Sequence, residues 1–138
     1  MHITQETDYA VRIVYCLAKC GTRRDARSIS EEMCISLRFS LKILGKLVGS
    51  DIVASYKGNR GGYELAHAPH EINLKDVITA VEGPYKLSRC VGADGASECN
   101  RGASGCCTFQ KVFADISRDI NEKLAAVNFQ DLLDAEKT

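Results

Sequence analysis

The sequence predicts a mainly helical chain with one small β-hairpin, an α+β fold arranged as a winged helix-turn-helix followed by a long C-terminal dimerisation helix. Three observations lead to this prediction. A short helix, a turn and an amphipathic helix occupy residues 28–49, and a glycine-rich hairpin follows at residues 52–66. One apolar stripe at helical spacing then extends from residue 109 to residue 127.

The first predicted helix extends from Thr4 to Lys19 and ends at Gly21. Its apolar residues form two stripes at helical spacing, which indicates a helix that is buried on more than one side. Cys16 and Cys20 lie four residues apart on the second stripe. We interpret them as buried thiols that act as small hydrophobic side chains.

The helix-turn-helix candidate begins with a short helix that Ser28 or Ser30 can cap. Residues 34–36 form the turn, and Ser36 can cap the longer helix at residues 37–49. Four apolar side chains line one face of the longer helix. Another face carries a basic row of Arg38, Lys42 and Lys46. This stretch alone fits a helix that inserts into DNA and an ordinary helical hairpin with solvated lysines equally well.

The hairpin that follows has strands at residues 52–56 and 63–66, joined by a tight turn at residues 57–62. The turn carries Lys57 and Arg60 among glycines, on backbone that can approach another surface closely. A hairpin directly after a helix-turn-helix is typical of a winged helix. Solvated loop charges are the alternative interpretation of the two cations.

The second half of the chain holds a loop with two histidines, which we interpret as solvated, and a short helix at residues 74–82 that ends at Gly83 and Pro84. The apolar stripe at residues 109–127 predicts pairing with the same helix of a second copy, and packing onto its own domain is the alternative. A short tail follows from residue 129.

These elements predict four parts of the chain. They are a winged helix-turn-helix DNA-binding domain at residues 1–66, a linker with a short helix at 67–87, a cysteine loop that binds a cluster at 88–107, and the dimerisation helix with its tail at 108–138.

Composition excludes some classes of protein. No apolar run approaches the length of a membrane span and no basic-then-apolar signal region begins the chain, so we expect a cytoplasmic protein. The 18 basic and 18 acidic side chains cancel, but residues 19–60 hold nine basic and four acidic ones. This local positive charge favours a nucleic-acid partner despite the zero net charge.

Four of the seven cysteines lie in one glycine-rich segment of eighteen residues. They are Cys90, Cys99, Cys106 and Cys107. The odd count and the expected cytosolic location argue against a disulfide framework. Structural zinc sites usually contain paired ligands two to four residues apart, whereas the wide gaps here favour an iron-sulfur cluster. A redox thiol switch, zinc and free thiols are the alternatives. One of the two adjacent cysteines would be the main ligand, and the helix that follows would stabilise its thiolate.

The arrangement resembles the winged-helix iron-sulfur transcription regulators of the IscR, NsrR, RirA and CymR type, over nearly the whole chain. The matching segments are residues 3–10, 35–47, 58–65 and 77–83, and the cysteine loop that leads into the long helix. The resemblance implies a homodimeric, DNA-binding regulator, expected to act as a repressor, that holds a 2Fe-2S or 4Fe-4S cluster and senses iron, nitric oxide or redox state.

The resemblance also implies the ligands of the cluster. Cys90, Cys99 and Cys107 match the three cysteine ligands of the family. The IscR type takes its fourth ligand from a histidine, and Gln110 occupies that position here, whereas Asp8 matches the aspartate of the NsrR type. We therefore predict Asp8 as the fourth ligand, with Cys106 in reserve and an ion pair with Arg12 as the alternative role of Asp8.

For DNA we expect the helix at residues 36–49 to enter the major groove and the wing to enter the minor groove. The predicted DNA-binding side chains are Ser28, Ser36, Arg38, Phe39, Lys42, Lys46, Lys57, Asn59 and Arg60. A winged-helix regulator that uses thiol oxidation or a small ligand without a cluster is the alternative function. An enzyme or electron carrier is disfavoured, because the sequence has no nucleophile-base motif and no phosphate loop.

Overall fold

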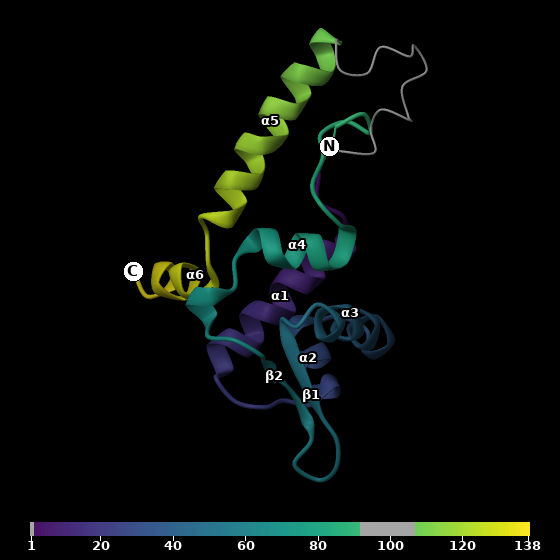
Figure 1. The fold of residues 1–138 in the computed structure, drawn as a ribbon. Coiled ribbons are helices and arrows are strands. Elements are labelled where there is room, and N and C mark those ends of the chain that lie inside the picture. Colours follow the sequence, from purple (N-terminus) through teal and green to yellow (C-terminus); the bar gives the residue numbers. More distant parts are fainter. Residues whose placement is uncertain (1, 92–106) are drawn as a thin grey trace.

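The computed structural model describes residues 2–91 and 107–138. Its helices and strands confirm the predicted winged-helix architecture (Figure 1). They are α1 (Gln5–Cys20), α2 (Ala26–Met33), α3 (Leu37–Gly49), β1 (Val53–Tyr56), β2 (Gly62–Leu65), a 3₁₀ turn η1 (Pro69–Glu71), α4 (Leu74–Glu82), α5 (Thr108–Ala125) and α6 (Phe129–Glu136).

The ends of the helices follow local capping signals. The Thr4 hydroxyl accepts a hydrogen bond from the Thr7 amide at the start of α1, and Gly21 ends that helix with a φ of 69°. Asp25 caps α2, in place of the serines expected, because its carboxylate accepts from the Ser28 amide at 2.6 Å. Ser36 caps α3 as expected.

The core forms around α1, which packs against α2, α3, α4 and α6. Apolar side chains from all of these helices meet there with no exposed surface, because each helix turns one apolar stripe inward. They include Ala10, Ile13 and Val14 of α1, Ile29 of α2, Ile43, Leu44 and Leu47 of α3, Val77 of α4 and Phe129 of α6. This burial fixes α3 by its inner face and leaves its outer face to solvent.

The wing is an antiparallel hairpin in which Val53 pairs with Leu65 and Tyr56 with Gly62. The segment before α2 also joins it, because Arg24 and Tyr63 exchange backbone hydrogen bonds of 2.9 and 2.7 Å. Gly62 is required at this junction. Its φ is +140°, and a Cβ atom there would lie 2.7 Å from the Arg24 carbonyl oxygen.

The C-terminal half differs from the expectation at one point. Residues 129–136 form helix α6, where the sequence predicted only a short tail, and Phe129 is fully buried in the core. The Phe129 amide donates to the Ile72 carbonyl at 3.0 Å, which anchors the start of α6 beside η1. By contrast, α5 projects away from the body of the molecule, with α4 as its main neighbour (Figure 1).

Two serines of α3, Ser40 in the helix and Ser36 at its N-cap, provide a test of stability. The Ser40 side chain is fully buried, and its hydroxyl has no hydrogen-bond partner within the described residues. Ser40→Ala should therefore raise the free energy of unfolding by about 1 kcal/mol in urea denaturation, because an unpaired polar group is removed and alanine favours helix. Ser36→Ala should lower it by about 1 kcal/mol, because a helix cap is lost. A loss of stability in Ser40→Ala would contradict this account.

Candidate nucleic-acid interface and cysteine site

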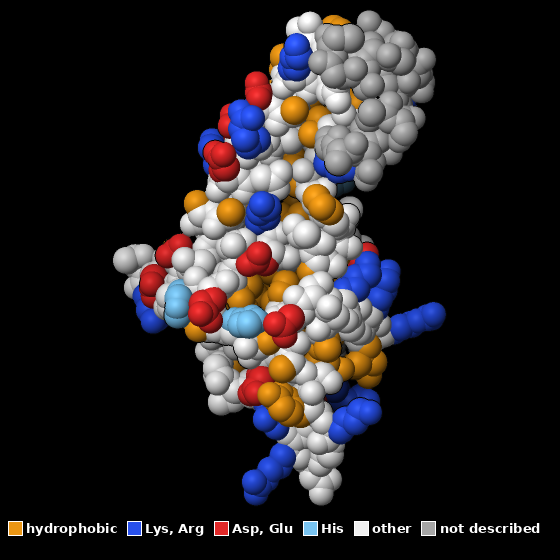
Figure 2. All heavy atoms as spheres, in the orientation of Figure 1, with side chains coloured by type: hydrophobic (Ala, Val, Ile, Leu, Met, Phe, Trp, Pro, Cys, Tyr) orange, Lys and Arg blue, Asp and Glu red, His pale blue; other side chains and the backbone are white. Residues whose placement is uncertain are grey.

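The outer face of α3 presents two exposed cations, one of which, Lys42, lies with its Nζ 3.5 Å from Glu6 Oε1. Arg38 and Lys42 are exposed, and the Lys42 side chain retains 57% of its accessible surface. Phe39 is half-buried, and its ring meets the Tyr9 ring edge-on at 5.5 Å, so it holds α3 against α1. Basic side chains project around this part of the surface (Figure 2).

Lys46 has a different role from the other two cations. Its Nζ lies 2.7 Å from Glu6 Oε1 and donates to the Val81 carbonyl at 3.4 Å. The hydrogen bond from Lys46 holds the pKa of Glu6 below its ordinary value. Lys46 therefore ties α3 to α1 and to the end of α4, and we leave it out of the proposed DNA contacts.

The tip of the wing carries Lys57, Asn59 and Arg60, all exposed. Arg23, which no sequence pattern indicated, supports this tip. Its guanidinium stacks 3.4 Å from the centre of the Tyr56 ring and donates to the Arg60 carbonyl at 3.3 Å. No local pattern could have revealed this role, because the contacts connect segments more than thirty residues apart.

Ser28 lies at the inner side of the helix-turn-helix, where its hydroxyl accepts from Arg24 Nε at 2.9 Å. The Arg24 guanidinium also pairs with Glu32 and lies 3.1 Å from Cys16 Sγ. Burial raises the pKa of Cys16 to about 11, so this thiol stays protonated at neutral pH, as a buried structural cysteine does.

The expectation that Cys20 is buried was wrong. Cys20 is the last residue of α1 and is exposed, because the helix ends there beyond the core. A hydrogen bond with the Thr22 hydroxyl at 3.1 Å lowers the pKa of Cys20.

Two of the four clustered cysteines lie in the described part of the chain. Cys90 and Cys107 are both partly exposed, and Cys99 and Cys106 lie outside the described residues. Gln110 Nε2 donates to the Cys90 carbonyl at 2.8 Å, so the first turn of α5 is tied to the backbone of Cys90. Cys107 is the N-cap residue of α5, but its side chain makes no capping hydrogen bond. Its thiol is therefore free of a capping role.

The other predicted ligand, Asp8, lies in the first turn of α1 and forms an ion pair with Arg12 at 2.7 Å. Both side chains are more than two-fifths exposed, so this pair contributes little stability. Among the residues that the structure describes, no three His, Cys, Asp or Glu side chains converge as a metal site.

The winged helix and the cysteine segment together match one family. The model of the Rrf2 family, described as iron-dependent transcriptional regulators, matches residues 3–135. The chain belongs to the Rrf2 family.

Similar proteins agree with this assignment. The Rrf2 chain is 32% identical over 135 residues to the HTH-type transcriptional regulator IscR of Aliivibrio salmonicida, with 96% of this chain and 77% of that protein covered. Its fold is similar to the solved structure of T. potens IscR, with a TM-score of 0.76 and 22% identity over 99% of this chain and 88% of the other. CymR, the global cysteine regulator of B. subtilis, gives a TM-score of 0.75 at 22% identity and covers 100% of this chain and 98% of its own.

The family decides the broad class of function. Rrf2 proteins are transcriptional regulators, so the predictions of a DNA-binding winged helix and of a protein that is not an enzyme are confirmed. The electron-carrier interpretation is set aside for the same reason. No helix in the described ranges, residues 2–91 and 107–138, has the length and apolar character to cross a membrane.

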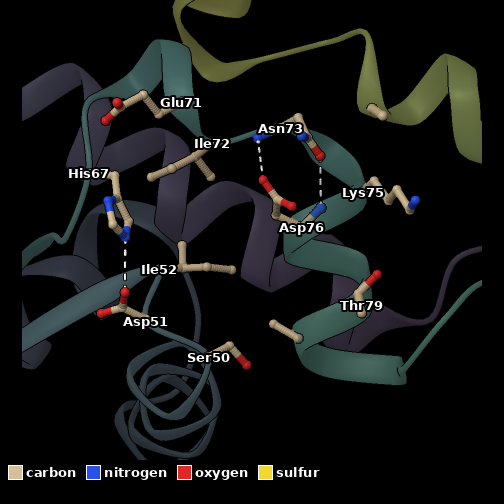
Figure 3. Close-up of a pocket in the computed structure, with 12 residues that line it drawn as sticks. Ser50, Asp51, Ile52, His67, Glu71, Ile72, Asn73, Lys75, Asp76 and Thr79 are labelled. Atoms are coloured by element: carbon tan, nitrogen blue, oxygen red, sulfur yellow. Dashed lines mark hydrogen bonds and ion pairs between the residues drawn. The ribbon is translucent and has the colours of Figure 1, made fainter.

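The Rrf2 chain also has a cavity of about 690 Å³ between the end of α3, η1 and the start of α4 (Figure 3). Its acidic groups already have partners. Asp51 lies 3.0 Å from His67 Nε2, and Asp76 accepts from the Asn73 amide at 3.1 Å as part of the α4 cap. We therefore interpret these side chains as structural, because they end α3 and begin α4.

Proposed function

We propose that the chain is a homodimeric repressor that binds a near-palindromic operator and whose affinity is controlled by an iron-sulfur cluster. The observation that carries the DNA-binding part is the exposed outer face of α3 beside a glycine-rich wing, both with exposed cations. Two such units in a symmetric dimer would address two half-sites about one helical turn apart.

The proposed DNA contacts divide between the two grooves. Arg38 and Lys42 of α3, with Ser36 at its start, approach bases and phosphates of the major groove, while Phe39 positions the helix. Lys57, Asn59 and Arg60 of the wing approach the minor groove, where negative potential is concentrated. Ser28, held by Arg24, supports the arrangement from α2.

The proposed dimer interface is the outer face of α5. Phe109, Val112 and Ile116 are at least 40% exposed and follow one another at helical spacing on this face. Ile120, one turn after Ile116, lines a groove of about 720 Å³. Its other lining side chains include the apolar Ile3, Ile78, Tyr85, Leu87 and Leu124 and the polar or charged His2, Glu82 and Lys86. A second copy of α5 fits this surface, because an exposed apolar stripe of this kind is typical of a protein interface.

The residues at the cysteine site suit a thiolate-bound cluster. Cys90 and Cys107 are accessible, neither is in a disulfide, and Gln110 ties Cys90 to the start of α5. We propose Cys90, Cys99 and Cys107 as ligands, with Asp8 of the other subunit as the fourth and Cys106 in reserve. The group would supply a centre that is lost or oxidised in response to iron, nitric oxide or redox state.

The chain's own contacts connect this site to α3. The Thr4 amide donates to Glu82 at the end of α4, directly before the segment that leads to Cys90. One residue earlier, the Val81 carbonyl accepts from Lys46 of α3, and Glu6 holds the same lysine. A shift of residues 83–91 would therefore be transmitted to α3 through these bonds. It would regulate DNA binding if the two states of the protein differ in DNA affinity.

Metal analysis of anaerobically purified protein tests the cluster. We expect iron and acid-labile sulfide with a visible absorption spectrum, all lost in Cys90→Ser. Cys20→Ser is the control, because it removes an exposed thiol of α1 outside the proposed ligand set. Asp8→Ala should change the spectrum if Asp8 is the fourth ligand. Colourless protein without iron, even after reconstitution, would refute the cluster and favour a regulator that uses thiol oxidation or a small ligand.

A further inference from the structure

The outer face of α3 also carries two uncharged residues, Leu41 and Gly45. Attraction to DNA phosphates does not account for either residue on this face. Leu41 is 45% exposed, although Ile43, Leu44 and Leu47 of the same helix are fully buried. It lies one helical turn from Arg38 and next to Lys42 in the chain, on the face that carries these exposed cations. A leucine in this position is available to a partner and contributes little to the core.

Gly45 lies one turn further along the same face. Glycine in a helix interior is destabilising relative to alanine. Its backbone is ordinary, and a Cβ atom would meet nothing within 4 Å in the described structure. Neither conformation nor packing within these residues therefore requires glycine. Its lack of a side chain leaves one flank of Leu41 uncovered and brings the backbone of α3 to the surface.

We propose that Leu41 recognises the 5-methyl group of a thymine in the major groove, and that Gly45 lets α3 approach the DNA closely enough for this contact. The inference rests on the proposed insertion of α3 into the major groove. Apolar side chains recognise thymine by its methyl group, which no other base of unmodified DNA presents there. Arg38 and Lys42 would contact phosphates and bases on either side, and Leu41 would add a preference for thymine that the two cations do not supply.

The test replaces thymine by uracil, which removes only the methyl group. The full-length protein first selects its operator from a random pool of DNA duplexes. Each thymine of that operator is then replaced by uracil, and affinity is measured by fluorescence anisotropy for the unaltered protein and for Leu41→Ala. We expect one thymine in each half-site whose replacement weakens the unaltered protein about 4-fold, and about 15-fold in both half-sites together.

The same replacements should leave the affinity of Leu41→Ala unchanged, and Leu41→Met should restore the sensitivity because it restores an apolar contact. If every replacement of thymine by uracil changes the affinity of Leu41→Ala as much as it changes that of the unaltered protein, the inference is wrong while DNA binding stands. If the unaltered protein enriches no duplex, DNA binding through α3 fails as well. These two failures are therefore distinguishable.

Gly45→Ala tests the close approach separately. The variant should melt about 3 °C higher than the unaltered protein, because alanine favours helix, and yet bind the selected operator at least 10-fold more weakly. A purely structural role would move stability and affinity in the same direction. Unchanged operator affinity in Gly45→Ala would overturn the close approach.

Discussion

The double variant Lys42→Ala, Arg60→Ala is expected to bind its operator about 10³-fold more weakly than the unaltered protein at 0.15 M salt. Each cation that neutralises a phosphate contributes about 0.9 to the slope of log affinity against log salt concentration. A dimer loses four such contacts in this variant, so the slope should become about 3.6 less steep. Both side chains are exposed on the proposed DNA face, and the core should be unaffected.

Footprinting and a salt titration of the affinity measure this effect. The matched control is Lys75→Ala, Lys111→Ala, which removes the same number of exposed positive charges from α4 and α5. The control should retain the footprint and nearly the full salt slope. Equal affinity of the double variant and the unaltered protein would refute our placement of the DNA face.

The second large effect is expected at α5. Ile116→Asp should raise the dissociation constant of the dimer at least about 100-fold, because it places an unpaired charge in the proposed apolar interface. Ile116 is 40% exposed in the single chain, so the fold of the monomer should be unchanged. Analytical ultracentrifugation over a concentration series measures the dissociation constant, and circular dichroism checks the fold.

Glu122→Lys is the control for this experiment. Glu122 is exposed on the opposite side of α5 from the apolar stripe, so a change of charge there should leave the dimer intact. Operator affinity should fall with dimerisation in Ile116→Asp, because a monomer contacts only one half-site. A fully dimeric Ile116→Asp protein would contradict an interface on this face.

Local sequence signals predicted most of the fold. Capping residues and periodic apolar positions located α1, α3 and α4 to within about a residue, because these signals act over one or two helical turns. Asp51, shortly after the end of α3, adopts a left-handed backbone conformation with a φ of 60°, which favours glycine and which no capping pattern predicted. By contrast, α6 was missed, because its formation depends on Phe129 reaching a core pocket beside η1.

For the candidate site, too, some features could be predicted from the sequence and others could not. The residue types and spacing of the basic row and of the cysteines indicated a DNA-binding regulator, and the family match confirmed that class. From their spacing, Arg38, Lys42 and Lys46 were predicted to form one basic row. In the structure Glu6 pairs with both lysines, but only Lys46 also donates to the Val81 carbonyl, and its side chain is 37% exposed against 57% for Lys42.

The sequence by itself thus determined the class of the protein, the order of its elements and the chemical types of its sites, all of which depend on residue identity and short-range periodicity. Only the tertiary structure decided how exposed each cation of α3 is, that Arg23 supports the wing, and that Leu41 and Gly45 share an exposed face. The physical reason is that exposure and pairing depend on contacts between segments far apart in the chain. Such contacts form only when the helices pack together.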